Sequence, residues 1–421
     1  MKIIKSYSLF FGSIGFGLLI WMLSYIILPL TPVEPLKAET VFFIGACYLA
    51  LVVGFLAFNF HRDTSKKYVL SHKKTVKLLL IIIIASYLLR WYDLFFVRDL
   101  SFINDLKFNR ILNEKNFKEN QVLLIIASVL KSLYFFPFVI CIRSNMSHKK
   151  LYVLASYLVL FFPIVEAVLK GNRKPFFEIF LIVAITVIAY QRKQINFKRI
   201  GLAVLAVLLM MTISMLILFK REKLSENLDA KFYESMFESR YNEILRPTEK
   251  AINYFQNDEN SVVSKLFALS IMHTGQYIAH GVFELNHIIN MDNLPITYGK
   301  YNFSTIPKFL NKTNLANIEI TNPSPRDYVY LTLFGSFYID FRWFTPVFLF
   351  LFGVLQKYIY QRALQSFIYT PVLIYVLIIN VFLMILSYTR GAGIYTFFSF
   401  VFLLFLLRIF EKNLYEKSVG P

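Results

Sequence analysis

The sequence predicts an all-α membrane protein that crosses the bilayer many times. Of its 421 residues, 57% are hydrophobic and only 17% are charged, which is unusual for soluble domains. Apolar stretches of the roughly 20 residues that a membrane-spanning helix needs recur between Tyr7 and Leu407. A net charge of +19 is also typical of nucleic-acid-binding proteins, but 45 phenylalanines favour a lipid environment. We therefore expect membrane lipid, and no nucleic acid, as a partner.

About ten apolar segments have the length and composition of transmembrane helices. The first follows Lys2 and Lys5 as a signal peptide would, but its apolar stretch is too long and no small-residue cleavage site follows it. We expect it to be a retained helix. The expected spans cover about residues 7–30, 41–60, 77–97, 122–142, 150–169, 176–190, 200–219, 343–361, 371–389 and 392–409.

Basic residues are concentrated in alternate loops between these spans. Those loops and the two chain ends hold 20 basic and 3 acidic residues, and so +17 of the net charge of +19. The positive-inside rule makes this side cytoplasmic. Both termini are then cytoplasmic, and segments 31–40, 91–121, 170–175 and 220–327 face outward.

The expected spans divide the chain into three regions. Residues 1–219 form an N-terminal bundle of seven spans, 220–327 a large outward loop domain, and 328–421 a C-terminal region with three spans. The apolar segment 328–341 is shorter than a span. We expect it to be a re-entrant or interfacial helix, because a full crossing there would place Arg362 on the outer side.

The outward domain is too long to be a mere connection and should fold. It has 12 basic and 13 acidic residues. Apolar residues recur with helical spacing over 231–255, which Pro247 interrupts, and again from 262 to about 289. The chain beyond is punctuated by proline and glycine. We expect a helical cap with an extended, polar second half.

The outward turn Lys170-Gly171-Asn172-Arg173-Lys174-Pro175 is the first candidate binding site. Gly171 permits a tight turn and Pro175 can open the next helix, whose N-terminus would lie beside Arg173. Backbone N–H groups together with Lys170, Arg173 and Lys174 could bind a phosphate. The alternative is that these cations snorkel beside lipid headgroups.

A second outward turn, Thr389-Arg390-Gly391, contains the only basic residue between Gln365 and Leu407. An isolated arginine within a membrane region is costly, which makes Arg390 a candidate for function; an interfacial anchor is the alternative. Arg246 and Arg326 in the outward domain are weaker candidates, which could contact sugar or form local ion pairs.

Three histidines, His273, His280 and His287, are spaced by seven residues along 262–289, near one helical face. Neighbours are about 10 Å apart along the helix, too far to share one ion, so we expect no metal and no other cofactor. Glu284 follows His280 by one turn and could orient its imidazole and raise its pKa, as in general bases. His280 and Glu284 are thus the predicted catalytic residues; a structural histidine is the alternative.

These features together resemble the Wzy-type oligosaccharide repeat unit polymerases of bacterial O-antigen and capsule synthesis. The similar features are the ten or so spans with one large late outward loop, Lys-Gly-Asn-Arg-Lys at 170–174, Gln-Tyr-Ile-Ala-His-Gly-Val-Phe-Glu-Leu at 276–285, Leu-Phe-Gly-Ser-Phe-Tyr-Ile-Asp-Phe at 333–341 followed by Gly353, and the late Thr389-Arg390-Gly391 turn. Many members have glycine after the Asp-Phe pair, whereas this chain has Arg342. We assign that position no family role.

The resemblance implies a multi-pass protein of the bacterial inner membrane that transfers a growing glycan from undecaprenyl pyrophosphate to a new lipid-linked repeat unit at the periplasmic face. His280 with Glu284 would then activate the acceptor hydroxyl. Arg173 and Arg390, with Lys174 and Lys170, would stabilise the pyrophosphate leaving group. The resemblance also implies a chain-length regulator and a flippase as partners.

Three alternatives fit parts of the same pattern. An O-antigen ligase or another lipid-linked-sugar glycosyltransferase would use similar cations. A polysaccharide flippase or transporter would need a polar cavity, but internal repeats are typical of transporters and none is visible in the sequence. A scaffold in a glycan assembly complex would tolerate loss of the outward arginines.

Overall fold

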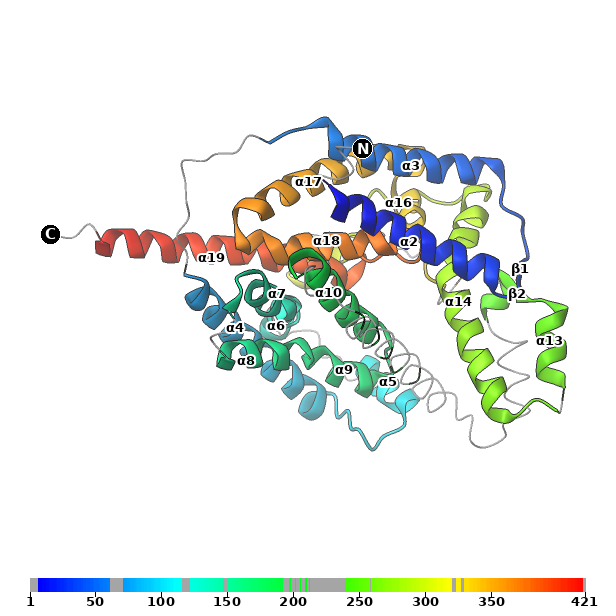
Figure 1. The fold of residues 1–421 in the computed structure, drawn as a ribbon, viewed down its shortest axis with the longest axis horizontal. Coiled ribbons are helices and arrows are strands. Elements are labelled where there is room, and N and C mark those ends of the chain that lie inside the picture. Colours follow the sequence, from blue (N-terminus) through cyan, green and yellow to red (C-terminus); the bar gives the residue numbers. More distant parts are fainter. Residues whose placement is uncertain are drawn as a thin grey trace. The chain divides into compact units, whose positions relative to one another are not determined.

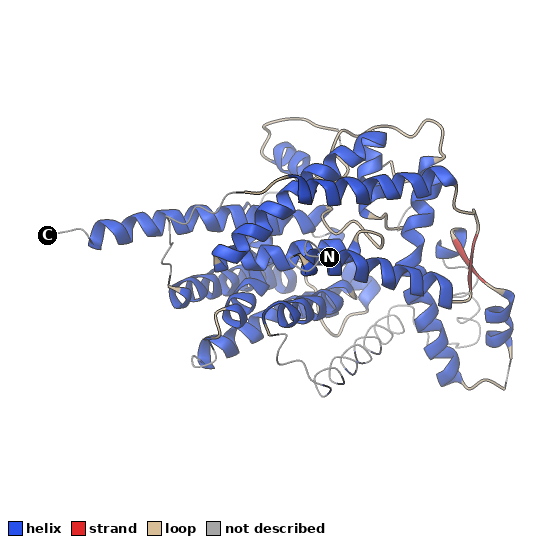
Figure 2. Ribbon diagram, turned by 45° about the horizontal axis from the view of Figure 1, so that its top comes forward, coloured by secondary structure: helices blue, strands red, loops and turns tan. Residues whose placement is uncertain are grey.

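The computed structural model is mostly helical, with 76% helix and 2% strand (Figure 2). It describes residues 7–60, 71–115, 122–146, 150–191, 240–257, 259–319, 323–326 and 329–418, with isolated positions between 197 and 212. The expected span at 200–219 and the first part of the outward domain lie almost entirely outside the described residues.

Six described helices are long and apolar enough to cross a membrane, so the membrane character is supported. They are Ser8–Ile27, Ala38–Ala57, His72–Val97, Leu124–Arg143, Lys150–Lys170 and Leu333–Gln365, and the shorter apolar helices Phe367–Phe382 and Tyr395–Leu407 accompany them. The expected count of about ten is not confirmed. The orientation of the chain remains a prediction.

The helices form two compact units, each assembled from separate stretches of chain. The first unit contains Met1–Asn59, Leu218–Lys357 and Val376–Gly391. The second contains Phe60–Ile217, Tyr358–Tyr375 and Ala392–Pro421.

The first unit combines apolar helices with the outward domain (Figure 1). Its elements are α2 (Ser8–Ile27), β1 (Leu30–Pro32), α3 (Ala38–Ala57), a 3₁₀ turn (Arg240–Glu243), β2 (Leu245–Pro247), α13 (Glu249–Gln256), α14 (Val262–Ile289), α15 (Thr305–Lys312), α16 (Leu333–Phe341), a 3₁₀ turn (Arg342–Phe344), the first part of α17 (Thr345–Gln365) and the last part of α18 (Thr370–Phe382).

The second unit is helical throughout its described part. Its elements are α4 (His72–Tyr92), a π-helical turn η1 (Asp93–Val97), α5 (Leu106–Lys115), α6 (Val122–Leu130), a 3₁₀ turn η2 (Lys131–Phe135), α7 (Phe136–Arg143), α8 (Lys150–Leu160), α9 (Phe162–Lys170), α10 (Lys174–Tyr190), the end of α17, a 3₁₀ turn (Phe367–Tyr369), the start of α18, most of a 3₁₀ turn (Gly391–Ile394) and α19 (Tyr395–Ser418).

Glycines allow the apolar helices of the first unit to pack at backbone distance. A Cβ on Gly54 of α3 would lie 2.0 Å from the carbonyl oxygen of Phe350 in α17, and one on Gly353 would lie 2.2 Å from that of Leu51. Small residues at such crossings are typical of membrane helix pairs, because packing rather than the hydrophobic effect drives their association. This crossing fixes α17, and with it the end of α16.

The outward domain differs in part from its prediction. Helix α14 matches the expected stretch, and Ser261 caps it by accepting a hydrogen bond from the Ser264 N–H at 3.3 Å. Of the expected helical stretch 231–255, residues 231–239 lie outside the described residues. Residues 240–248 are not α-helical as expected, because β2 there pairs antiparallel with β1 in the register Leu30↔Pro247, and only α13 matches the expected helix. This pairing joins chain segments more than 200 residues apart, and helical periodicity cannot reveal it.

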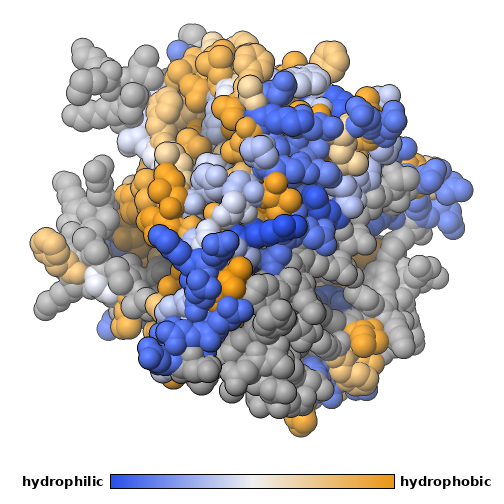
Figure 3. Space-filling model, turned by 90° about the vertical axis from the view of Figure 1, so that its right-hand side faces the viewer, coloured by the Kyte–Doolittle hydropathy of each residue, from blue (hydrophilic) through white to orange (hydrophobic). Residues whose placement is uncertain are grey.

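Helix α14 is held from two sides within the first unit. The Asn286 side-chain oxygen accepts hydrogen bonds from the Lys37 N–H (2.9 Å) and the Thr40 hydroxyl (2.8 Å) at the start of α3. Ala279 and Phe283 pack in a buried apolar cluster with Leu245 of β2. On the face shown in Figure 3, a large area of hydrophilic side chains lies beside hydrophobic ones.

The expected re-entrant helix is not confirmed. Helix α16 begins at Leu333, where Thr332 caps it, and ends at Phe341. Arg342 then adopts φ 53°, a left-handed conformation that is uncommon for a residue with a side chain. The break separates α16 from α17 within one long apolar stretch.

Candidate functional site

His280 lies on α14 with no exposed surface. Its Nδ1 is 2.9 Å from the carbonyl oxygen of Gln276 one turn earlier, so Nδ1 carries the proton. Among the described residues, Nε2 has no hydrogen-bond partner and is buried. Burial lowers the pKa of His280 to about 4. Nearby backbone carbonyl groups, among them that of Tyr330, raise the pKa and offset only part of this decrease. The ring is therefore neutral at pH 7, with a lone pair on Nε2.

Glu284 does not take up the role expected of it. Its Oε2 is 2.5 Å from Nη1 of Arg326, and Arg326 Nε is 3.3 Å from Glu243. Glu284 is fully buried, and burial raises its pKa. The positive charge of the Arg326 guanidinium lowers that pKa and so opposes the effect of burial. The expectation that Glu284 raises the pKa of His280 is wrong. The carboxylate is paired with Arg326 instead, and desolvation lowers the pKa of the imidazole.

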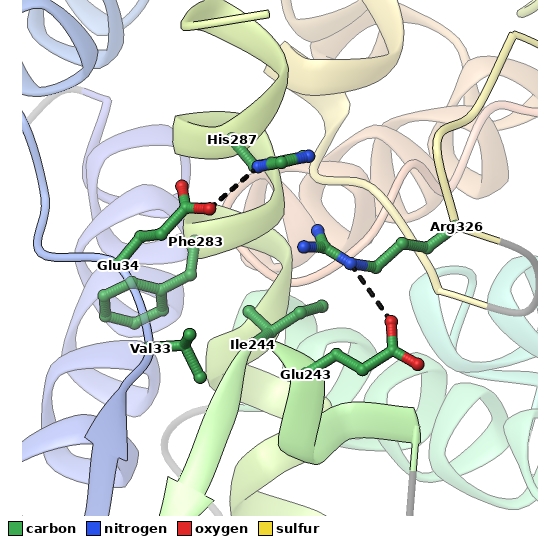
Figure 4. Close-up of a pocket in the computed structure, with 7 residues that line it drawn as sticks. All are labelled: Val33, Glu34, Glu243, Ile244, Phe283, His287 and Arg326. Atoms are coloured by element: carbon green, nitrogen blue, oxygen red, sulfur yellow. Dashed lines mark hydrogen bonds and ion pairs between the residues drawn. The ribbon is translucent and has the colours of Figure 1, made fainter.

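Arg326 and Glu243 line a pocket (Figure 4). The pocket has about 190 Å³ of empty space, part of it open to solvent. His287 Nδ1 is 3.0 Å from Glu34 on one side, while the Arg326–Glu243 pair lies on the other. Of the three predicted histidines, His287 is the one that lines it.

Aromatic side chains lie around the His280 imidazole. The ring centroid of Tyr241 is 4.8 Å from that of the imidazole, and the centroid of Tyr277 is 5.8 Å away. Tyr330, which is 52% exposed, packs edge-on against Tyr277 at 5.6 Å. A row of aromatic rings therefore leads from the surface to the buried imidazole.

Arg390 lies on the surface of the same unit, above a buried tyrosine. Its guanidinium carbon is 3.6 Å from the ring centroid of Tyr301, and Nη1 donates to the tyrosine hydroxyl at 2.7 Å. Among the described residues, no carboxylate forms an ion pair with Arg390. Its charge is thus available to a ligand.

Tyr301 is held in place by Asp340 of α16. The fully buried carboxylate accepts hydrogen bonds from the Thr297 hydroxyl, the Tyr301 N–H (3.0 Å), and the N–H (3.0 Å) and side-chain amide (2.7 Å) of Asn302. We call residues 297–302 with Asp340 the anchored loop. All four donors are neutral groups that belong to the loop, so the carboxylate fixes the loop. It forms no ion pair with Arg390 and therefore does not neutralise that charge by direct contact.

Tyr301 interacts electrostatically with both Arg390 and Glu284. Burial raises its pKa; Arg390 and the Ser324 hydroxyl lower it, whereas the charges of Asp340 and Glu284 add to the increase. Ser324 also donates to the Arg326 carbonyl oxygen at 3.2 Å. The pKa of Tyr301 thus responds to the charges of both Arg390 and Glu284, and His280 lies one turn before Glu284 on α14.

The other predicted residues lie elsewhere. Arg246 is exposed on β2, and its Nε donates to the Asn242 carbonyl oxygen at 3.4 Å. Lys170, Arg173 and Lys174 belong to the second unit. Lys170 is 3.5 Å from Glu166, four residues earlier on α9, as in an i, i+4 helical ion pair.

The Lys170–Pro175 turn has the predicted backbone. Gly171 adopts φ 64° and ends α9, with the Asn172 N–H donating to the Ala167 carbonyl oxygen at 2.8 Å, as in a Schellman motif. Pro175 lies in the first turn of α10, which Arg173 precedes directly. A Cβ on Gly171 would also approach the Leu106 side chain to 3.1 Å.

Comparison with known proteins adds no relative: no protein-family model, no curated protein and no solved structure matches this chain. The chemistry of the site therefore has to be inferred from its own residues.

Proposed function

We propose that this protein polymerises undecaprenyl-pyrophosphate-linked oligosaccharide repeat units by glycosyl transfer at the periplasmic face of the bacterial inner membrane, in the synthesis of O-antigen or a related surface polysaccharide. The observation that carries the proposal is Arg390, a surface cation without an ion-pair partner among the described residues, in one compact unit with a buried, neutral imidazole.

The leaving group is the first requirement of this reaction. The bond between the anomeric carbon of the growing glycan and the pyrophosphate oxygen breaks, so negative charge develops on that oxygen. Arg390, oriented by stacking on Tyr301, is suited to stabilise it. Loss of one preorganised donor to a developing anion costs on the order of 10²- to 10³-fold in rate. Lys170, Arg173 and Lys174 are further candidates for this role.

The acceptor is the second requirement. A hydroxyl of the new repeat unit attacks the anomeric carbon and transfers its proton to a base. Nε2 of His280 has a lone pair and no partner among the described residues, as an acceptor for a substrate hydroxyl requires. Its low pKa makes it a weak base, and this suits a reaction in which departure of the leaving group is well advanced before the proton moves.

Recognition of the sugars is the third requirement. The aromatic row of Tyr330, Tyr277 and Tyr241 offers flat apolar surfaces of the kind that line ligand sites. The Arg326–Glu284 pair adds donors and acceptors beside it. Arg246 is a further, exposed candidate for contact with sugar.

Reconstitution with lipid-linked repeat units tests the proposal. The wild-type protein in liposomes should give a ladder of longer glycans, and Arg390→Ala and His280→Ala should each slow the ladder about 100-fold. Lys308→Ala, at an exposed lysine of α15, is the control and should leave the ladder unchanged. If both site variants keep wild-type rates, the assigned site is wrong.

The same assay separates the alternatives. Transfer of the glycan to a different acceptor, without a ladder, would indicate an O-antigen ligase. Movement of lipid-linked units across the bilayer without any product would indicate a flippase or transporter.

A further inference from the structure

The second half of the outward domain, expected to be polar, has apolar side chains at its surface. Tyr298 is 77% exposed, and Ile306 and Phe309, which share one face of α15 by their spacing, are exposed as well. At the start of α17, Phe344 is 73% exposed. We call the following residues the junction surface: Ile296, Tyr298, Ile306, Phe309, Trp343 and Phe344.

Contacts with α16 hold the first part of the junction surface in place. The Tyr298 N–H donates to the carbonyl oxygen of Asp340 at 3.2 Å, and the Asp340 carboxylate fixes the anchored loop. Phe303, which lies two residues before α15, packs edge-on against Phe337 of α16, with ring centroids 6.2 Å apart. The anchored loop and the start of α15 are therefore attached to the end of α16, where α17 also begins.

The exposed apolar side chains of α15 are carried by ordered backbone. The Asn311 side-chain amide donates to the Ile318 carbonyl oxygen at 2.7 Å, and its oxygen accepts from the Ile318 N–H at 2.8 Å. The Leu315 N–H donates to the Leu310 carbonyl oxygen at 3.0 Å and so closes the end of α15. A short ordered helix with an exposed apolar face is typical of segments that lie on a membrane.

The start of α17 lies at a boundary of the bilayer. Helix α17 has 21 residues, and a helix of this length is about 30 Å long, the thickness of the hydrocarbon core. It can therefore cross the membrane without α16. Arg342 and Trp343 directly precede it, and the Trp343 ring packs edge-on against Phe43 of α3 at 5.4 Å. Tryptophan and tyrosine are enriched where membrane meets water.

The junction surface continues a surface that faces lipid. Val347 and Leu351 follow Trp343 at intervals of four residues, so they share one face of α17, and all three side chains are exposed. Exposed apolar side chains on a spanning helix contact lipid acyl chains. The residues 293–318 also include no acidic residue, as suits a segment at lipid, where a carboxylate would be costly. The long stems of lysines let their amines reach water from such a surface.

We propose that the junction surface is seated in the interfacial layer of the lipid bilayer, so that α15 lies on the membrane instead of extending into water. The partner of this surface is lipid. The aromatic rings lie at the level of the headgroups, and Ile306 and Phe309 reach about 5–10 Å into the boundary with the acyl chains. This seating fixes the depth of the anchored loop, and it does not rest on the proposed function.

Spin labelling of the full-length protein in vesicles of phosphatidylcholine and phosphatidylglycerol tests the seating. Cys47 and Cys141 are buried and should not react, so one nitroxide is attached at Phe309→Cys. Labels at Leu351→Cys, on the lipid-facing side of α17, and at Lys250→Cys, exposed on α13, are the references for lipid and water. Collisions with oxygen report the bilayer, and collisions with a nickel chelate report water.

The oxygen-to-nickel collision ratio of the Phe309 label should be several-fold higher than that of the Lys250 label and lower than that of the Leu351 label. A ratio equal to that of the Lys250 label would overturn the proposal. A Phe309 label shielded from both reagents would overturn it as well, because the surface would then be covered by protein and not by lipid.

A charge placed on the junction surface should lift α15 away from the lipid. With the nitroxide at Ile306→Cys, Phe309→Glu should lower the collision ratio towards that of water. Asn317→Glu adds the same charge at an exposed polar residue of the same segment and should leave the ratio unchanged. Equal ratios in the two variants would contradict the proposal. Should Phe309→Glu fail to insert, Phe309→Ser replaces it.

These ratios are measured without any glycan substrate, so they are independent of glycosyl transfer. The expected ratios without a glycan ladder would sink the proposed function alone. Water-like ratios at α15 together with a normal ladder would sink the membrane seating alone.

Discussion

Asp340 in the first unit is fully buried and Glu166 in the second is 12% exposed, and the two carboxylates are neutralised in different ways. Asp340 accepts hydrogen bonds from neutral donors of the anchored loop, whereas Glu166 faces three cations. Neutral donors fix a segment of chain without using up positive charge. Glu166 instead joins cations from α4, from η2 and from its own helix, α9. The difference assigns the fixing of a loop to Asp340 and the joining of helices to Glu166.

Asp340→Ala should have the largest effect on stability, because it leaves several buried donors without an acceptor. We expect a loss of about 4 kcal/mol in the free energy of unfolding. The anchored loop should also become accessible to protease. Both are measurable in detergent by denaturant unfolding and limited proteolysis.

Asp292→Ala is the matched control, because Asp292 is an exposed carboxylate five residues before Thr297. Equal unfolding curves for the two variants would show that Asp340 does not anchor the loop, and the contrast with Glu166 would lose its basis.

Arg326→Gln should cost about 3 kcal/mol at neutral or higher pH, because it leaves Glu284 buried without its cation. Burial already raises the pKa of Glu284, and loss of Arg326 removes the main opposing cause. A carboxyl whose pKa is raised on folding destabilises the folded state as pH increases through that pKa. The variant should therefore be less stable at pH 8 than at pH 5.

The double variant Arg326→Gln/Glu284→Gln tests this explanation, because it replaces the ion pair by two neutral amides. It should recover most of the stability and lose the pH dependence. A double variant as unstable as Arg326→Gln would indicate that packing of the arginine, and not charge, is responsible.

His280 should make stability fall in acid. Its pKa is about 4 in the folded protein and about 6.5 in an unfolded chain. The unfolded state therefore binds the proton first, and stability decreases as pH falls from about 6.5 to about 4, by on the order of 3 kcal/mol. His280→Asn should remove this part of the acid dependence. His287→Gln, at a partly exposed histidine, should keep it; equal profiles for all three proteins would contradict the burial of the imidazole.

Local patterns in the sequence predict local structure well here. The apolar periodicity predicts α14 to within a residue or two. Glycine at position 171 predicts the left-handed end of α9. Each of these features depends on neighbours within one or two helical turns.

Partners distant in the sequence were not predictable. Arg390 and Tyr301 are 89 residues apart, and Arg326 and Glu284 are 42 apart. The spacing of Glu284 after His280 indicated a catalytic pair, but a competing arginine from another segment takes the carboxylate. Arg90 and Lys131 reach Glu166 only through the packing of separate helices. Without related sequences, no signal in one chain reports such contacts.

Tyr301→Phe should have the smallest effect of these variants on stability. It tests most directly whether the anchored loop, fixed by Asp340, positions Arg390. The variant keeps the ring beneath Arg390 and removes only the hydroxyl acceptor at 2.7 Å, so we expect a stability change of about 1 kcal/mol or less. If the anchored loop positions the guanidinium mainly by stacking, glycosyl transfer should slow only a few-fold, against about 100-fold for Arg390→Ala. Tyr301→Leu, which removes the ring, should approach the Arg390→Ala rate while Asp340 still holds the loop. Equal rates for Tyr301→Phe and Tyr301→Leu would show that the ring does not orient the cation, and positioning by the anchored loop would then have no chemical consequence at Arg390.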